Sequence, residues 1–138
     1  MEGQADKPTR SQLDFFKTAL RGHSKVAELE PIEGSRVPPE QVYNVHRNGD
    51  LPPVRVYLTN LYTVSEAELV CITADVQNLD CIVTMSNWNE YTSDANRLAS
   101  ERKIGLFNVA EFMGALNWRF PWKYNKRDSG ASPRMGRK

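Results

Sequence analysis

The sequence predicts a single α/β domain in which helices flank a mixed central β-sheet. The chain has 138 residues, of which 40% are hydrophobic and 25% are charged, and this composition is typical of one globular domain with an ordinary core. Along the chain the hydrophobic period changes from helical to alternating, and later to short apolar runs separated by helices. The predicted element order is α-β-β-β-α-β-α-β-α, and strands separated by single helices are expected to be parallel.

The first half of the domain is predicted to be a helix followed by three strands. Leu13, Phe16 and Leu20 recur at helical spacing. Phe15 widens this apolar face, and Gly22 is expected to end the helix. Strands are predicted over residues 25–31, 42–45 and 53–59, and the Asn-Gly-Asp sequence at 48–50 predicts the turn between the last two.

The second half alternates helices with short strands. Ser65 and Glu68 have the spacing of a capping box, which predicts the start of a helix that ends near residue 78. Residues 80–85 are a short apolar run, as is typical of a buried parallel strand. A helix over 93–103, a strand over 104–107 and a last helix from 108 to about 117 complete the order.

Composition divides the chain into a leader, a domain and a tail. Residues 1–9 are expected to be a flexible leader, residues 10–118 the α/β domain, and residues 119–138 a basic, aromatic C-terminal tail. Residues 1–118 hold 11 Lys and Arg against 16 Asp and Glu, whereas residues 119–138 hold seven bases and the single acid Asp128. A mildly acidic body therefore precedes a basic tail.

The cysteines and the N-terminal residues indicate a cytoplasmic protein. Cys71 and Cys81 lie in apolar surroundings, and two cysteines form neither a disulfide framework nor a zinc site, so both are expected to be reduced core residues. The first residues lack the bases and the apolar run of a signal peptide, and no stretch approaches about 18 apolar residues. No association with a membrane is expected.

The succession of motifs in the second half points to a known fold. A polar turn follows the apolar strand at residues 84–87, then comes a helix with Ala95, Leu98 and Ala99, and then a short strand over 104–107 and a capped helix. With the element order, this succession resembles the restriction-endonuclease-like superfamily, and within it the Mrr-type members, over about residues 40–116. The resemblance implies metal-dependent cleavage of phosphodiester bonds, which needs carboxylates that hold Mg²⁺ and a lysine beside the attacking water.

The residues at the family's active-site positions are of the wrong chemical type. The family has an Asp on the second strand of the meander, and a Glu or Gln followed two residues later by Lys on the third. Here Asn44 stands at the Asp position, Tyr57 at the Glu position and Thr59 at the Lys position. An amide, a neutral phenol and a hydroxyl do not replace anionic metal ligands and a positive charge. The resemblance therefore implies a catalytically degenerate domain, for which no cofactor is expected.

A rearranged active site is the alternative within the same fold. Asp50 follows the hairpin turn, and Glu66 or Glu68 at the start of the next helix would supply a migrated ligand, which would make the chain a Mg²⁺-dependent nuclease. The simpler interpretation is that Asp50 belongs to the turn and Glu68 to the capping box.

Two segments are candidate binding sites for nucleic acid or for a protein partner. The polar loop after residue 85 is expected at the carboxyl edge of the sheet, where α/β proteins bind ligands. Residues 118–127, at the start of the tail, interleave four aromatic residues with four bases; bases attract phosphates, and aromatic rings stack on unpaired nucleobases. The candidate residues are Ser86, Asn87, Trp88 and Asn89 in the loop and Arg119, Trp122, Lys123, Tyr124, Lys126 and Arg127 in the tail.

Three functions are consistent with these features. The first is a degenerate nuclease-fold domain that binds nucleic acid or a nucleoprotein partner. The second is a non-enzymatic accessory or inhibitor subunit whose exposed aromatic residues contact a protein, or a second copy of the chain in a homodimer. The third is the metal-dependent nuclease with the rearranged site. For Trp88, Trp118, Phe120 and Trp122, the alternative to binding is packing on the domain itself.

Overall fold

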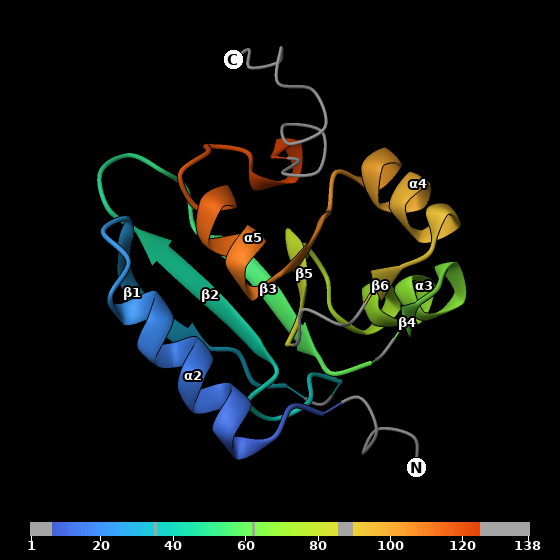
Figure 1. Cartoon of the computed structure of the whole chain (residues 1–138), viewed down its shortest axis with the longest axis horizontal. Helices are drawn as coiled ribbons and strands as arrows, with labels where there is room; N and C mark the ends of the chain where they lie inside the picture. Colours follow the sequence, from blue (N-terminus) through green and yellow to red (C-terminus); the bar gives the residue numbers. More distant parts are fainter. Residues whose placement is uncertain (1–6, 35, 62, 86–89, 125–138) are drawn as a thin grey trace.

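The structure is built on a five-stranded mixed β-sheet with two helices against each face (Figure 1). It is a computed structural model that describes residues 7–34, 36–61, 63–85 and 90–124. Within these residues the order of the main elements agrees with the predicted one, so the single α/β domain with a mixed sheet flanked by helices is confirmed.

The strands of the central sheet lie in chain order. They are β1 (Val26–Pro31), β2 (Val42–Arg47), β3 (Val54–Thr59), β5 (Cys81–Thr84) and β7 (Gly105–Asn108). The first three form an antiparallel meander, and β5 and β7 are parallel to β3. The carboxyl ends of the three parallel strands therefore meet at one edge, where Thr59, Thr84 and Asn108 stand in register.

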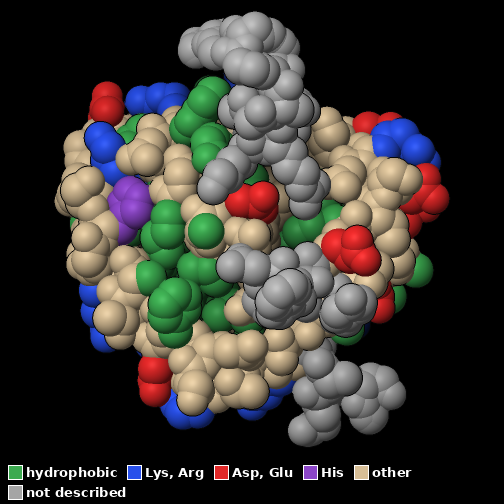
Figure 2. Space-filling model, in the orientation of Figure 1, with side chains coloured by type: hydrophobic (Ala, Val, Ile, Leu, Met, Phe, Trp, Pro, Cys, Tyr) green, Lys and Arg blue, Asp and Glu red, His purple; other side chains and the backbone are tan. Residues whose placement is uncertain are grey.

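Each face of the sheet buries a hydrophobic core. The helices α2 (Arg10–Arg21) and α5 (Val109–Ala115) cover one face, and α3 (Glu66–Asp75) and α4 (Ser93–Arg102) cover the other (Figure 1). In the space-filling view of the same side, Lys and Arg side chains lie around the rim of the molecule (Figure 2). No helix in the described part of the chain is both long and apolar enough to span a bilayer.

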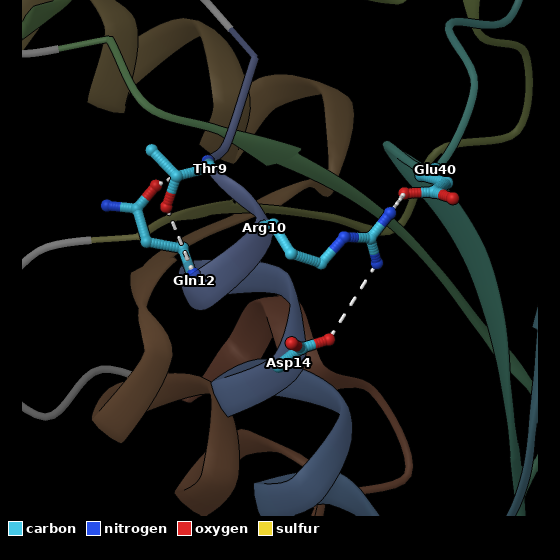
Figure 3. A network of polar contacts seen from close by, with 5 residues as sticks. All are labelled: Thr9, Arg10, Gln12, Asp14 and Glu40. Atoms are coloured by element: carbon cyan, nitrogen blue, oxygen red, sulfur yellow. Dashed lines mark hydrogen bonds and ion pairs between the residues drawn. The ribbon is translucent and has the colours of Figure 1, made fainter.

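The first helix is fixed at its start by local and tertiary contacts (Figure 3). The Thr9 hydroxyl accepts a hydrogen bond from the Gln12 backbone N–H at 3.1 Å, and the Gln12 side chain accepts one from the Thr9 backbone N–H at 3.0 Å. Arg10 forms an ion pair with Glu40 at 2.8 Å and a longer one with Asp14 at 3.7 Å. The capping box sets where α2 begins, and Arg10 ties it to the loop before β2.

Capping residues likewise set the start of two later helices. The predicted capping box of Ser65 and Glu68 is confirmed at α3. Asn108 and Glu111 form another one at α5, where a capped helix start is predicted. The sequence does not predict β4 (Thr63–Val64) and β6 (Glu90–Tyr91), which pair in parallel as a separate sheet, because two residues are too few to show a hydrophobic period.

Two predictions of burial are wrong. Phe15 is 61% exposed, because the face of α2 that packs against the sheet is narrower than the spacing of the apolar residues in this helix predicts. Cys71 is exposed, because α3 directs Leu69 and Ile72 into the core and turns Cys71 outward. Cys81 is buried as expected, and both cysteines are free thiols.

Candidate nucleic-acid interface

The chain after α5 folds back over the end of the domain. A short 3-10 helix, η1 (Pro121–Lys123), follows a bend at residues 118–120, and Pro121 is buried. The Cα of Trp122 lies close to Gly105, the first residue of β7, so the segment sits at the amino ends of the parallel strands. The sequence assigns residues 119–124 to a tail, whereas the structure packs them on the domain.

A buried arginine fastens this segment to the β2–β3 hairpin. The Arg47 side chain is 6% exposed. Its guanidinium donates hydrogen bonds to the carbonyl oxygens of Pro52, Leu116, Trp118 and Arg119 at 2.9, 2.9, 2.6 and 3.2 Å. Burial disfavours the charged form and lowers the pKa of Arg47. One side chain of the second strand thus fixes the backbone on both sides of Trp118.

Tyr124 provides a second attachment. Its ring lies 6.0 Å from the ring of Phe107 in the core and 6.0 Å from that of Trp118, which it meets in a T-shaped contact. Gly114 of α5 makes room for it, because a Cβ at that position would lie 2.6 Å from the Tyr124 hydroxyl oxygen. Burial raises the pKa of Tyr124. The aromatic ring therefore holds the end of the described chain against the domain.

The fastened segment presents aromatic rings and positive charges to the solvent. Trp118 is 47% exposed and Phe120 is 48% exposed. The Lys123 ammonium lies 5.1 Å from the Phe120 ring centre and 5.6 Å from that of Trp122. We call the group the basic aromatic surface; its members are Trp118, Phe120, Trp122, Lys103, Arg119 and Lys123.

Lys103 joins this surface from a distant part of the chain. It ends α4 in the left-handed conformation, with φ of 62°, and its ammonium lies 5.9 Å from the Trp122 ring centre. Arg119 forms an ion pair with Asp50 at 3.6 Å. Two lysine ammonium groups are thus close to the rings of Phe120 and Trp122, and Arg119 adds a third cation to the same segment. This combination suits an anionic ligand that also has planar groups.

The predicted binding residues of the tail divide into two sets. Arg119, Trp122, Lys123 and Tyr124 lie together at the basic aromatic surface or directly support it. The other predicted residues, Lys126 and Arg127 of the tail and Ser86, Asn87, Trp88 and Asn89 of the loop, lie outside the described residues. The strand before that loop, β5, ends at the carboxyl edge of the sheet, which is the edge away from Gly105.

The polar groups at the carboxyl edge are used by the fold. The Thr84 hydroxyl donates to the carbonyl oxygen of Phe107 at 3.4 Å, and the Tyr91 hydroxyl donates to the same oxygen at 2.7 Å. Asn108 caps α5. Tyr91 is buried, and burial strongly raises its pKa. Within the described part of this edge, these contacts account for the polar groups of Thr84, Tyr91 and Asn108.

The three residues that the resemblance places at active-site positions share one face of β2 and β3, and their chemistry does not fit a Mg²⁺ ion. Asn44 accepts a hydrogen bond from the Arg55 side chain at 3.1 Å. Tyr57 and Thr59 are both buried, and the Thr59 hydroxyl accepts a hydrogen bond from the Leu61 backbone N–H at 3.1 Å. None of the three is an anion at neutral pH. Across the described residues, no three His, Cys, Asp or Glu side chains gather as metal ligands would.

The acids of the rearranged site lie at different ends of β3. Asp50 precedes the strand in the hairpin loop, and Glu66 and Glu68 follow it at the start of α3. A strand of this length separates its ends by roughly 17–20 Å. Glu68 is engaged in its capping box, where it accepts a hydrogen bond from the Ser65 backbone N–H at 2.8 Å. The structure therefore does not bring Asp50 and the two glutamates together.

Sequence reasoning missed Arg47 and Lys103. Arg47 alternates with the buried residues Tyr43 and Val45 along β2, so its position on the core side of the sheet was a usable signal. Lys103 gives no such signal, since only the tertiary fold brings the end of α4 next to Trp122.

The chain was compared with models of known protein families, with curated proteins and with solved structures, and none of the three comparisons found a match.

Proposed function

We propose that this chain is a catalytically inactive domain of the restriction-endonuclease-like kind that binds nucleic acid, alone or within a nucleoprotein, through the basic aromatic surface. The meander followed by helix-linked parallel strands supports the fold assignment. The loss of activity is supported by Asn44, Tyr57 and Thr59, which offer no anionic ligand for a metal ion.

One observation supports nucleic acid as the ligand more than any other. Trp118 and Phe120 are about half exposed although their backbone is held by Arg47 and Tyr124. Exposing large rings on a fixed backbone costs solvation free energy that burial would recover, so a ligand that covers them is favoured. Lys123 lies over the Phe120 ring, Lys103 and Lys123 lie over the neighbouring Trp122 ring, and Arg119 adds a further positive charge to the same segment. A polyanion with planar bases matches both the rings and the charges.

The test is binding of labelled oligonucleotides to the full chain, followed by fluorescence anisotropy over a salt series. We expect affinity to fall as salt rises, because bound phosphates release counterions. The double variant Lys103→Gln, Lys123→Gln should bind more weakly, with a salt slope smaller by about 0.7 per lysine on a single strand. The matched control is Lys17→Gln, Lys25→Gln, which removes the same charge from α2 and the turn after it. Equal weakening by both variants would contradict a specific site.

The same samples test the absence of catalysis. Oligonucleotides incubated with the protein and Mg²⁺ or Mn²⁺ should stay intact on a denaturing gel. Cleavage that disappears in Glu66→Gln or Glu68→Gln would instead support the rearranged nuclease. Glutamine is the suitable replacement at Glu68, because it still completes a capping box while it removes the charge.

A second candidate, the non-enzymatic interaction subunit, is favoured by the outer face of α3. Four exposed residues follow the helical spacing of this face, and no charged residue of α3 lies on it; they are Ala67, Val70, Cys71 and Ala74. If a second copy covers this face, light scattering should report a dimer, and Val70→Lys should return it to a monomer. A monomer at all concentrations would remove the homodimer form of this candidate.

A further inference from the structure

We infer that the basic aromatic surface selects nucleic acid with unpaired bases, and that Trp118 and Phe120 are the positions on which those bases stack. This inference rests on the proposed function, because it names the class of nucleic acid that the same surface takes. It adds a distinction between single strands and duplexes, and it assigns the stacking role to two residues.

The first step concerns what an exposed ring can reach. In a duplex both faces of every internal base are covered by neighbouring base pairs, and only the edges show in the grooves. An aromatic side chain on a convex surface therefore stacks on a base only where the base is unpaired or terminal. The T-shaped contact with Tyr124 covers at most one face of the Trp118 indole, and 47% of Trp118 remains exposed.

The second step concerns the charges beside the rings. Lys123 lies 5.1 Å from the Phe120 ring centre, and Lys103 and Lys123 lie 5.9 and 5.6 Å from that of Trp122. Both ammonium groups rest against rings in contacts that are weak when exposed to water. A nucleotide whose base stacks on this segment brings its phosphate close to these lysines. Each lysine then loses a weak contact with a ring and gains an ion pair with a phosphate. Lys123 must leave the face of Phe120 before a base stacks there, so we expect Trp118 to contribute more.

The third step is that the rings are held in place before any ligand arrives. Arg47 binds the carbonyl oxygens of Trp118 and Arg119, and Tyr124 closes the segment on Phe107. Little backbone ordering is then left for the binding event, which favours affinity. Arg47 therefore acts as a positioning residue, since it fixes the backbone of Trp118 and is itself buried away from the ligand.

The experiment compares one sequence in three forms with the full chain: a labelled single strand, its blunt duplex, and the duplex with a single-stranded overhang, each as DNA and as RNA. We expect the single strand and the overhang to bind about tenfold more tightly than the blunt duplex. Trp118→Leu should weaken single-strand binding by about tenfold, within the range known for one stacked base, and leave the salt slope unchanged. Phe120→Leu should have a smaller effect in the same direction.

The chain offers a matched control in Phe15→Leu, which removes a ring that is 61% exposed on α2, far along the chain from this surface. It should bind like the unmodified protein, and circular dichroism should show the same fold for all variants. Equal affinity for single strand and blunt duplex overturns the inference but leaves the proposed function standing. The inference is also overturned, and the proposed function also stands, if Trp118→Leu binds as tightly as the unmodified protein while the Lys103→Gln, Lys123→Gln variant binds weakly. No binding to any form overturns both.

Discussion

Arg47 shows how a single residue decides the geometry of the candidate site. Its guanidinium is buried and donates to four carbonyl oxygens, three of them in the segment after α5. We expect Arg47→Lys to lower the free energy of unfolding by about 2–4 kcal/mol, because one ammonium group cannot reach four acceptors and leaves buried carbonyls without donors. Urea denaturation measures this loss. An unchanged free energy of unfolding would contradict this expectation and would show that water molecules replace the missing hydrogen-bond donors.

Asp80 predicts how stability depends on pH. Burial raises its pKa above the ordinary value of 3.8, although a hydrogen bond from the Arg55 backbone N–H at 2.8 Å opposes the shift. The folded state then binds this proton more tightly than the unfolded state, so the stabilisation is full below about pH 3.8 and is lost as pH rises through the folded pKa. Asp80→Asn should lack this loss and gain stability relative to the original protein as pH rises from 3.5 to 6.

The control for Asp80 is Glu101→Gln, which removes one exposed acid from α4. Both variants are unfolded with urea at several pH values, and only the Asp80 variant should show the rising difference. A difference that falls with pH would mean that the charges of Arg55 and Arg47 outweigh burial.

At the scale of elements, the sequence determines helix starts better than the packing of helix faces. The Ser65 and Glu68 box was readable because capping is a contact between near neighbours in sequence. The sequence predicts Phe15 and Cys71 in the core because both lie among apolar residues, but which side of a helix faces the sheet is decided by the partner surface. The pairing of β4 with β6 is likewise set by tertiary structure, because two-residue strands are too short to show a hydrophobic period.

The end of α5 gives a prediction that separates local preference from packing. Replacing a helical glycine by alanine commonly stabilises a helix by up to about 1 kcal/mol. In Gly114→Ala, however, the new Cβ would lie 2.6 Å from the Tyr124 hydroxyl oxygen, so Tyr124 must move. We expect Gly114→Ala to destabilise the full chain but to stabilise a Tyr124→Ala background, as thermal unfolding of the four proteins of this cycle would show. Additive effects would contradict the contact.

At the scale of the whole molecule, the sequence shows the aromatic and basic residue types of the candidate site but not all of the residues that the fold brings together there. The interleaved aromatic and basic residues of the tail were visible in the sequence, and four of them lie at or beside the basic aromatic surface. The contributions of Arg47 and Lys103 depend on long-range packing, and so does the separation of Asp50 from Glu66 by the length of β3. Local patterns do not determine such distances.

The boundary of the domain is the property of the whole molecule that is most directly testable. The sequence places it at residue 118, whereas Pro121 and Tyr124 pack on the domain and Arg47 needs the carbonyl oxygens of Trp118 and Arg119. A chain of residues 1–124 keeps all of these contacts, so it should unfold at a higher urea concentration than a chain of residues 1–117. A chain of residues 1–117 should lose at least about 2 kcal/mol, because it uncovers apolar surface around Phe107 and leaves the buried guanidinium with fewer acceptors. If instead both truncated chains match the full one, the segment after α5 is dispensable for the fold, and the rings on it are not held in place for a ligand.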